Sequence, residues 1–173
     1  IYFPIQLNEL KAKINFHPLR EGTIEIFGAK LTSMYVNHPA FALGYRLDIG
    51  GHSLVYISDN EPFDREVARS LRNVEKVIVD KYLESEGDPN QRIFDFARGA
   101  DILIHDATYT PDEYVNRVGW GHSHYLFALT VAAEAQAKKL VLFHHDPSHN
   151  DEKIDEMVDT CKKEIKRRGY KFD

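Results

Sequence analysis

Histidines and carboxylates are concentrated in one stretch of the chain, from Leu140 to Asp151, which reads Leu-Val-Leu-Phe-His-His-Asp-Pro-Ser-His-Asn-Asp. Its leading apolar residues are typical of a short buried strand, and Pro147 prevents that strand from continuing. Because chemistry in open α/β sheets lies just beyond the carboxyl ends of strands, His144 and His145 are expected at the rim of a sheet. Imidazole and carboxylate together suit zinc, manganese or iron. The stretch therefore predicts either a metal site or simply a polar loop that follows a strand.

Other predicted strands also end on side chains that can bind metals, namely His38, Asp59 and the pair His105-Asp106. A polar residue ends most strands, so each ending alone is a weak signal. Together with His144, these endings predict that imidazoles and a carboxylate converge at one edge of a sheet. Because adjacent residues of a strand point to opposite faces, His144 rather than His145 is the expected ligand, and His105 is expected to face the core.

The first part of the chain predicts an antiparallel meander that would carry His38 and Asp59. Apolar alternation with β-branched residues indicates strands joined by short turns, and Gly50-Gly51 is a hairpin signal. The continuous apolar run Leu54–Ile57 predicts a strand that is buried on both faces. The predicted strands are residues 22–27, 31–37, 41–49 and 53–58.

The remainder predicts helices that alternate with two further buried strands. Thr110 and Glu113 have capping-box spacing, and Asn150 is expected to cap an amphipathic last helix. The predicted helices are residues 3–12, 64–84, 91–98 and 122–138 and the helix after Asn150, although residues 77–79 could equally form a short strand. The predicted strands are residues 101–105 and 140–143. Because linkers, repeats and low-complexity stretches are missing, residues 1–173 are expected to form a single α/β domain.

Composition narrows the class of protein. Hydrophobic residues make up 43% of the chain and charged residues 28%, as in ordinary globular proteins. The net charge of −5 argues against a broad nucleic-acid-binding face, although a local phosphate site is compatible with it. The single cysteine excludes an internal disulfide, and neither a membrane span nor a signal peptide is visible. We therefore expect a cytoplasmic protein that does not contact membranes.

Several motifs, in this order along the chain, resemble the second half of a metallo-β-lactamase-fold hydrolase, in the branch of ribonuclease Z and related phosphodiesterases. The motifs are Asn37-His38-Pro39, Val55-Tyr-Ile-Ser-Asp59-Asn-Glu61, Asp101-Ile-Leu-Ile-His-Asp106-Ala-Thr-Tyr109, Gly119-Trp-Gly-His122-Ser and Leu142-Phe-His-His-Asp-Pro-Ser-His-Asn-Asp151. The resemblance implies an αββα sandwich, of which this chain would be the C-terminal part.

The resemblance also implies roles for individual residues. His38, Asp59 and His144 match metal ligands, with Asp59 at the position that bridges two ions. His122 matches a histidine that faces the scissile phosphate, and Asp106 stands where related proteins carry a glutamate that would orient this imidazole. The implied cofactor is a pair of divalent ions, either zinc or manganese or iron. The implied reaction is hydrolysis by a metal-activated water, and the substrate is a small phosphate ester, a nucleotide-type ester or a nucleic-acid end.

One family motif is missing. The signature His-x-His-x-Asp-His does not occur in this sequence. We therefore expect the chain to be the later part of a longer protein and to be inactive alone, because the absent motif would supply further metal ligands. Two alternatives stay open. The chain could be a degenerate or truncated member that binds a ligand or partner without catalysis, or it could pair with a second copy or with a chain that supplies the other half.

Overall fold

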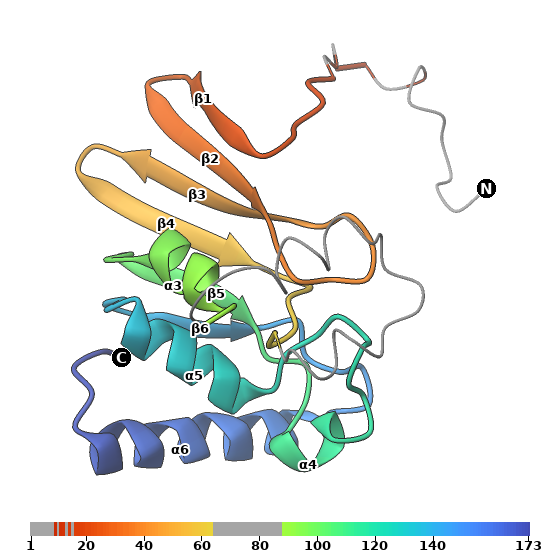
Figure 1. Cartoon of the computed structure of the whole chain (residues 1–173), viewed down its shortest axis with the longest axis vertical. Helices are drawn as coiled ribbons and strands as arrows, with labels where there is room; N and C mark the ends of the chain where they lie inside the picture. Colours follow the sequence, from red (N-terminus) through yellow and green to blue (C-terminus); the bar gives the residue numbers. More distant parts are fainter. Residues whose placement is uncertain (1–8, 10, 13, 15, 64–87) are drawn as a thin grey trace.

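The computed structural model describes residues 9, 11, 12, 14, 16–63 and 88–173 (Figure 1). The helix predicted for residues 64–84 lies outside the described residues, and the helix predicted for residues 3–12 lies largely outside them. The other predicted elements can be compared with the structure.

Six strands form one mixed sheet in the order β1-β2-β3-β4-β5-β6. The first four make the expected antiparallel meander, whereas β5 and β6 run parallel to β4. As a result, the carboxyl ends of β2, β4, β5 and β6 point to the same edge of the sheet. The strands are β1 (Gly22–Ile26), β2 (Ala29–Tyr35), β3 (Leu43–Ile49), β4 (His52–Ile57), β5 (Ile102–Asp106) and β6 (Leu140–Phe143).

Helices in the second half of the chain are fixed by local caps. Thr110 and Glu113 form the predicted capping box, with the Thr110 backbone N–H 2.7 Å from Glu113 Oε2. The Asn150 side chain accepts the backbone N–H of Lys153, as expected for an N-cap. No helix in the described ranges has the length and apolar character needed to cross a bilayer. The helices are α3 (Gln91–Ala97), α4 (Pro111–Tyr114), α5 (Tyr125–Glu134) and α6 (Asp151–Arg168).

Helices α3 and α5 cover one face of the sheet (Figure 1). Val55, Ile57 and Leu103 point to this side and are fully buried, which stabilises the fold by roughly 1.5–3 kcal/mol per side chain. The prediction that β4 is buried on both faces was wrong. Leu54 and Tyr56 are only half-buried, because strand alternation places them on the opposite face.

Helix α5 is shorter than the predicted helix 122–138. His124 is its N-cap, and its imidazole accepts the backbone N–H of Phe127. The residues before it are held extended because the backbone of His124 bridges that of Tyr109, and the Tyr125 N–H donates to the Tyr109 carbonyl. His122 therefore lies on an extended segment ahead of the helix and not in its first turn. At the other end, the positive φ of Gln136 stops the helix early.

Candidate functional site

Side chains from four separated segments meet at the carboxyl edge of the sheet. One ligand-type atom each from His38, Asp59 and His122 lies within 4.8 Å of the other two. His144 adjoins this group, with its Nε2 3.5 Å from Asp59 Oδ1 and its ring stacked on that of His122 at a centroid distance of 4.9 Å. The residues predicted as metal ligands, His38, Asp59 and His144, thus gather with the histidine predicted to be catalytic.

Two of these residues have a backbone conformation that is uncommon outside glycine. The φ angles are 49° for Asp59 and 59° for His144, both in the left-handed region. Such a conformation costs about 1–3 kcal/mol for a residue with a side chain, and it is concentrated at functional sites. In both cases the strand has just ended, so the sharp turn directs the side chain toward the site.

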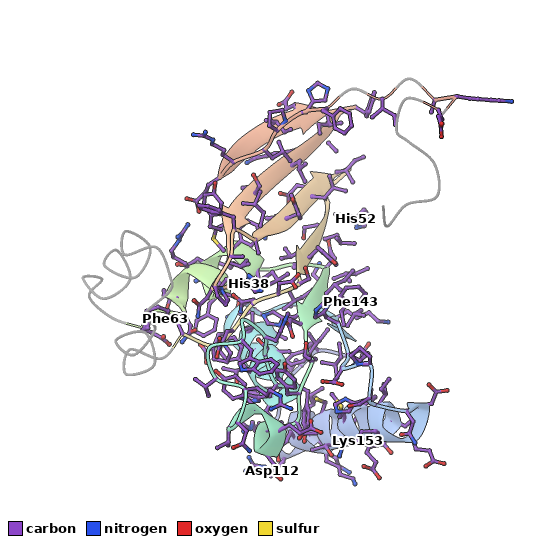
Figure 2. All side chains as sticks on the ribbon, turned by 90° about the vertical axis from the view of Figure 1, so that its right-hand side faces the viewer. His38, His52, Phe63, Asp112, Phe143 and Lys153 are labelled. Atoms are coloured by element: carbon purple, nitrogen blue, oxygen red, sulfur yellow. The ribbon has the colours of Figure 1, made fainter. Side chains whose placement is uncertain are left out.

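The ring of His38 is fixed by its own loop and by Gly121. Its Nδ1 lies 3.1 Å from the backbone nitrogen and 3.2 Å from the carbonyl oxygen of Ala40, which leaves Nε2 for the site. Gly121 packs directly against the ring, because a Cβ at this position would lie 2.7 Å from His38 Nε2 and 2.6 Å from Pro39 Cδ. Figure 2 shows His38 where the strand meander adjoins the helical part of the molecule.

Asp106 and His122 form the carboxylate–imidazole pair that the sequence predicted. Their Oδ2 and Nδ1 atoms are 2.9 Å apart, and the Asp106 side chain is fully buried. Asp106 accepts further hydrogen bonds from the backbone nitrogens of Asn60, Thr108 and Ser123 at 3.1–3.2 Å. The Thr108 hydroxyl donates either to Asp106 Oδ1 at 2.9 Å or to the His144 carbonyl at 2.7 Å, since it has one hydrogen.

These hydrogen bonds determine the protonation of Asp106 and His122. Burial alone would raise the pKa of Asp106, but the hydrogen bonds from His122 and Thr108 and the nearby His105 outweigh burial and lower it. The same hydrogen bond raises the pKa of His122, and it outweighs the opposing effect of burial. Asp106 therefore stays ionised, holds the proton on His122 Nδ1, and leaves Nε2 directed away from the pair.

Other histidines of the sequence motifs have separate surroundings. His105 faces the core as predicted: it is fully buried, its ring lies 6.0 Å from that of Phe127, and burial lowers its pKa. His149 Nε2 lies 3.1 Å from Glu113 Oε1, next to the capping box. Burial also lowers the pKa of His145. No described contact joins these three side chains to Asp59.

Sequence reasoning missed some of the residues that assemble the site. Glu61 and Ser123 are buried polar residues whose hydrogen bonds join loops far apart in the sequence. Both stand inside the quoted motifs, but their side-chain types alone do not indicate this role. Only the pairing of loops in three dimensions identifies them.

The donor set fits a divalent transition metal. Several imidazoles and one carboxylate are the ligands that zinc, manganese and iron accept. The side chains of Asp59 and His144 are 34% and 41% exposed, so an ion could reach them from solvent. His38 and His144 follow different strands, β2 and β6, as in sites where the fold and not a local motif supplies the ligands.

Comparison with known proteins identifies relatives of the chain. The chain matches no protein-family model. It is 26% identical to the ribonuclease Z of Thermoplasma volcanium over 182 residues, which covers 90% of this chain and 58% of that protein. It is 30% identical to the ribonuclease Z of Ignicoccus hospitalis over 152 residues, covering 77% of this chain and 51% of that protein. The chain thus spans about half the length of these relatives.

Solved structures show the same fold. The metallo-β-lactamase fold protein YhfI of Bacillus subtilis superimposes with a TM-score of 0.59 at 21% identity, covering 86% of this chain and 48% of that one. A putative zinc-dependent hydrolase of the metallo-β-lactamase superfamily from Thermotoga maritima gives a TM-score of 0.51 at 12% identity, covering 84% of this chain and 59% of that one. The chain therefore has a metallo-β-lactamase-type α/β fold, with ribonuclease Z homologues over most of its length.

Proposed function

We propose that the protein is a metal-dependent phosphodiesterase. The observation that carries this proposal is the hydrogen bond between the buried Asp106 and His122, whose imidazole forms one cluster with His38 and Asp59. His144 adjoins this cluster through Asp59. A carboxylate-oriented imidazole next to potential metal ligands suits hydrolysis of a phosphate ester. The ribonuclease Z homology over most of the chain supports the same reaction class.

His38, Asp59 and His144 would hold the metal. A bound divalent ion supplies Lewis acidity and lowers the pKa of a coordinated water. Because the chain spans about half the length of its relatives, we propose that ligands beyond these three complete a two-ion site in the whole protein. The proposed ions are zinc, manganese or iron, in keeping with the imidazole and carboxylate ligands.

His122 would contact the scissile phosphate or the leaving oxygen. Asp106 fixes the ring with its proton on Nδ1, so Nε2 is the atom that faces the site. In its protonated form, Nε2–H can donate a hydrogen bond to a phosphate oxygen or pass its proton to the departing alkoxide.

The proposed substrate is a small or nucleotide-type phosphodiester. The net charge of −5 disfavours a long nucleic-acid track, because such surfaces are basic. A nucleic-acid end bound only at the site remains compatible with that charge. We place the protein in the cytoplasm, in line with its single cysteine.

Metal retention tests the ligands. His144→Ala should lower the metal content found by elemental analysis after dialysis against zinc or manganese. His52→Ala is the matched control, because His52 is 84% exposed and begins β4, away from His38 in Figure 2. Equal metal content in both variants would contradict the assignment.

Turnover of bis-p-nitrophenyl phosphate tests the reaction. His122→Ala and Asp106→Asn should each lower kcat by about 10²–10⁴-fold, the usual contribution of general acid–base catalysis. His52→Ala should match the unmodified protein. The assay uses the whole protein, because the chain alone is expected to be inactive. A whole protein that retains metal but shows no turnover with added zinc or manganese would favour the binding-protein alternative.

A further inference from the structure

Glu61 is a buried acid that the proposed chemistry does not use. It follows Asp59 by two residues, yet its side chain points away from water and only 5% of the residue is exposed. Burying a carboxylate is costly unless donors surround it, so its partners indicate what it does.

The partners of Glu61 come mainly from the glycine-rich loop that precedes His122. Its Oε1 accepts the backbone N–H of Gly119 at 2.6 Å and the hydroxyl of Tyr114 at 2.9 Å. Its Oε2 accepts the backbone N–H of Gly121 at 2.9 Å. One carboxylate therefore holds both ends of the segment Gly119-Trp120-Gly121.

The backbone of Glu61 is tied to the loop that carries His38. Its N–H donates to the Asn37 carbonyl at 2.8 Å, and the Asn37 side-chain amide donates back to the Glu61 carbonyl at 2.9 Å. Glu61 thus joins two loops, one ending in His38 and the other in His122. The close packing of Gly121 against the His38 ring lies between these ties.

The held segment would otherwise be loosely constrained. Gly119 and Gly121 have φ angles of 86° and 90°, and glycine has more conformations to lose than any other residue. Hydrogen bonds to a charged acceptor are stronger than those between neutral groups, so the carboxylate is well suited to fix two such residues.

We propose that Glu61 is a positioning residue, which holds the 119–121 loop so that the His122 ring lies against His38 and Asp59. The structural part stands on the contacts above, and its catalytic consequence rests on the proposed function. Glu61→Gln is the test variant, because it keeps the size of the side chain but turns an amide donor toward a backbone N–H.

Trp120 offers a readout that needs no activity. It is the single tryptophan of the chain and stands between the two held glycines. Its ring lies under the Arg117 guanidinium, 4.8 Å from the centroid, which ties the indole to its loop. Time-resolved fluorescence anisotropy should show a larger fast component in Glu61→Gln. Tyr114→Phe is the control, because it removes a donor to the same carboxylate and leaves both glycine contacts in place.

Kinetic measurements distinguish a positioning role of Glu61 from a role in stability alone. In the active protein, Glu61→Gln should lower kcat by about a hundredfold, as expected for a reacting group misplaced by about 1 Å, with KM nearly unchanged. Tyr114→Phe should stay close to the unmodified protein in both quantities. A Glu61→Gln protein with lower thermal stability but unchanged anisotropy and kcat would overturn the proposal.

Two further results keep the test decisive. If the unmodified whole protein shows no turnover, the proposed function fails, but the anisotropy comparison still supports or overturns the loop contact. If Glu61→Gln does not fold, amide hydrogen exchange of the unmodified protein replaces it. The Gly119 and Gly121 amides should then be protected, and exchange at the rate of an unstructured peptide would overturn the proposal.

Discussion

Replacing Gly121 by alanine should destabilise the protein and lower its metal content more than the addition of one methyl group suggests. Gly121 stands directly before His122 and has a φ of 90°. The added methyl group would lie 2.7 Å from His38 Nε2, the nitrogen that we assign to the metal. Real side chains do not approach this closely, so His38 and Pro39 must move.

The size of the effect follows from two separate costs. A side chain in the left-handed region costs about 1–2 kcal/mol. Forcing an extra methyl group into a packed place costs about 1–3 kcal/mol more. We therefore expect Gly121→Ala to lower the free energy of unfolding by about 2–5 kcal/mol, a large share of the about 5–15 kcal/mol of a typical domain.

Gly51→Ala separates these two costs. Gly51 has a φ of 80° in the hairpin between β3 and β4, and a Cβ there would meet nothing within 4 Å. This variant should lose only the conformational part, about 1–2 kcal/mol. Urea unfolding gives both values, and elemental analysis gives the metal content. Equal destabilisation of the two variants, with equal metal retention, would refute the proposed contact between Gly121 and His38.

Two further predictions concern titratable groups outside the site. Hydrogen bonds from the Lys138 ammonium and the Ser53 N–H lower the pKa of Asp101 to about 2, below its value in the unfolded chain. The ionised Asp101 therefore stabilises the folded protein above about pH 4, and this stabilisation is lost as the pH falls through 2. The urea midpoint of Asp101→Asn should therefore be lower than that of the unmodified protein at pH 7, with a gap that closes toward pH 2; a constant gap would contradict this. Burial raises the pKa of the Cys161 thiol to about 11, so iodoacetamide should label it only at the rate of unfolding, and fast labelling of the folded protein would contradict its burial.

The convergence of these side chains at one site could be predicted from the sequence, because a local pattern of residues identifies the end of each contributing strand. An apolar run followed by a metal-type side chain identifies the ends at Asp59, Asp106 and His144. Parallel pairing of β4, β5 and β6 then brings these ends to one edge. Adjacent residues alternate between faces, which is why His105 could be assigned to the core.

The errors came where distant contacts override local preference. The Ala-rich helix was predicted to begin at His122, but bridging between Tyr109 and His124 delays its start to Tyr125. The apolar run of β4 could not reveal that Leu54 and Tyr56 face away from the helices. The role of Glu61 was equally hidden, because its donors come from residues more than fifty positions later.

Two buried carboxylates, those of Asp106 and Glu61, hold different parts of the site in place. Asp106 accepts donors around His122 and fixes its ring, whereas Glu61 accepts donors around the loop that delivers this ring. Asp106 accepts three backbone N–H groups and Glu61 accepts two, which offsets the cost of burying their charges. Hydrogen bonds also stabilise the strained turns at Asp59 and His144. The Ser123 hydroxyl donates to the carbonyl of Asn60, which follows Asp59, and the Thr108 hydroxyl lies within hydrogen-bond distance of the His144 carbonyl. The backbone of the site is therefore set by polar contacts within this chain.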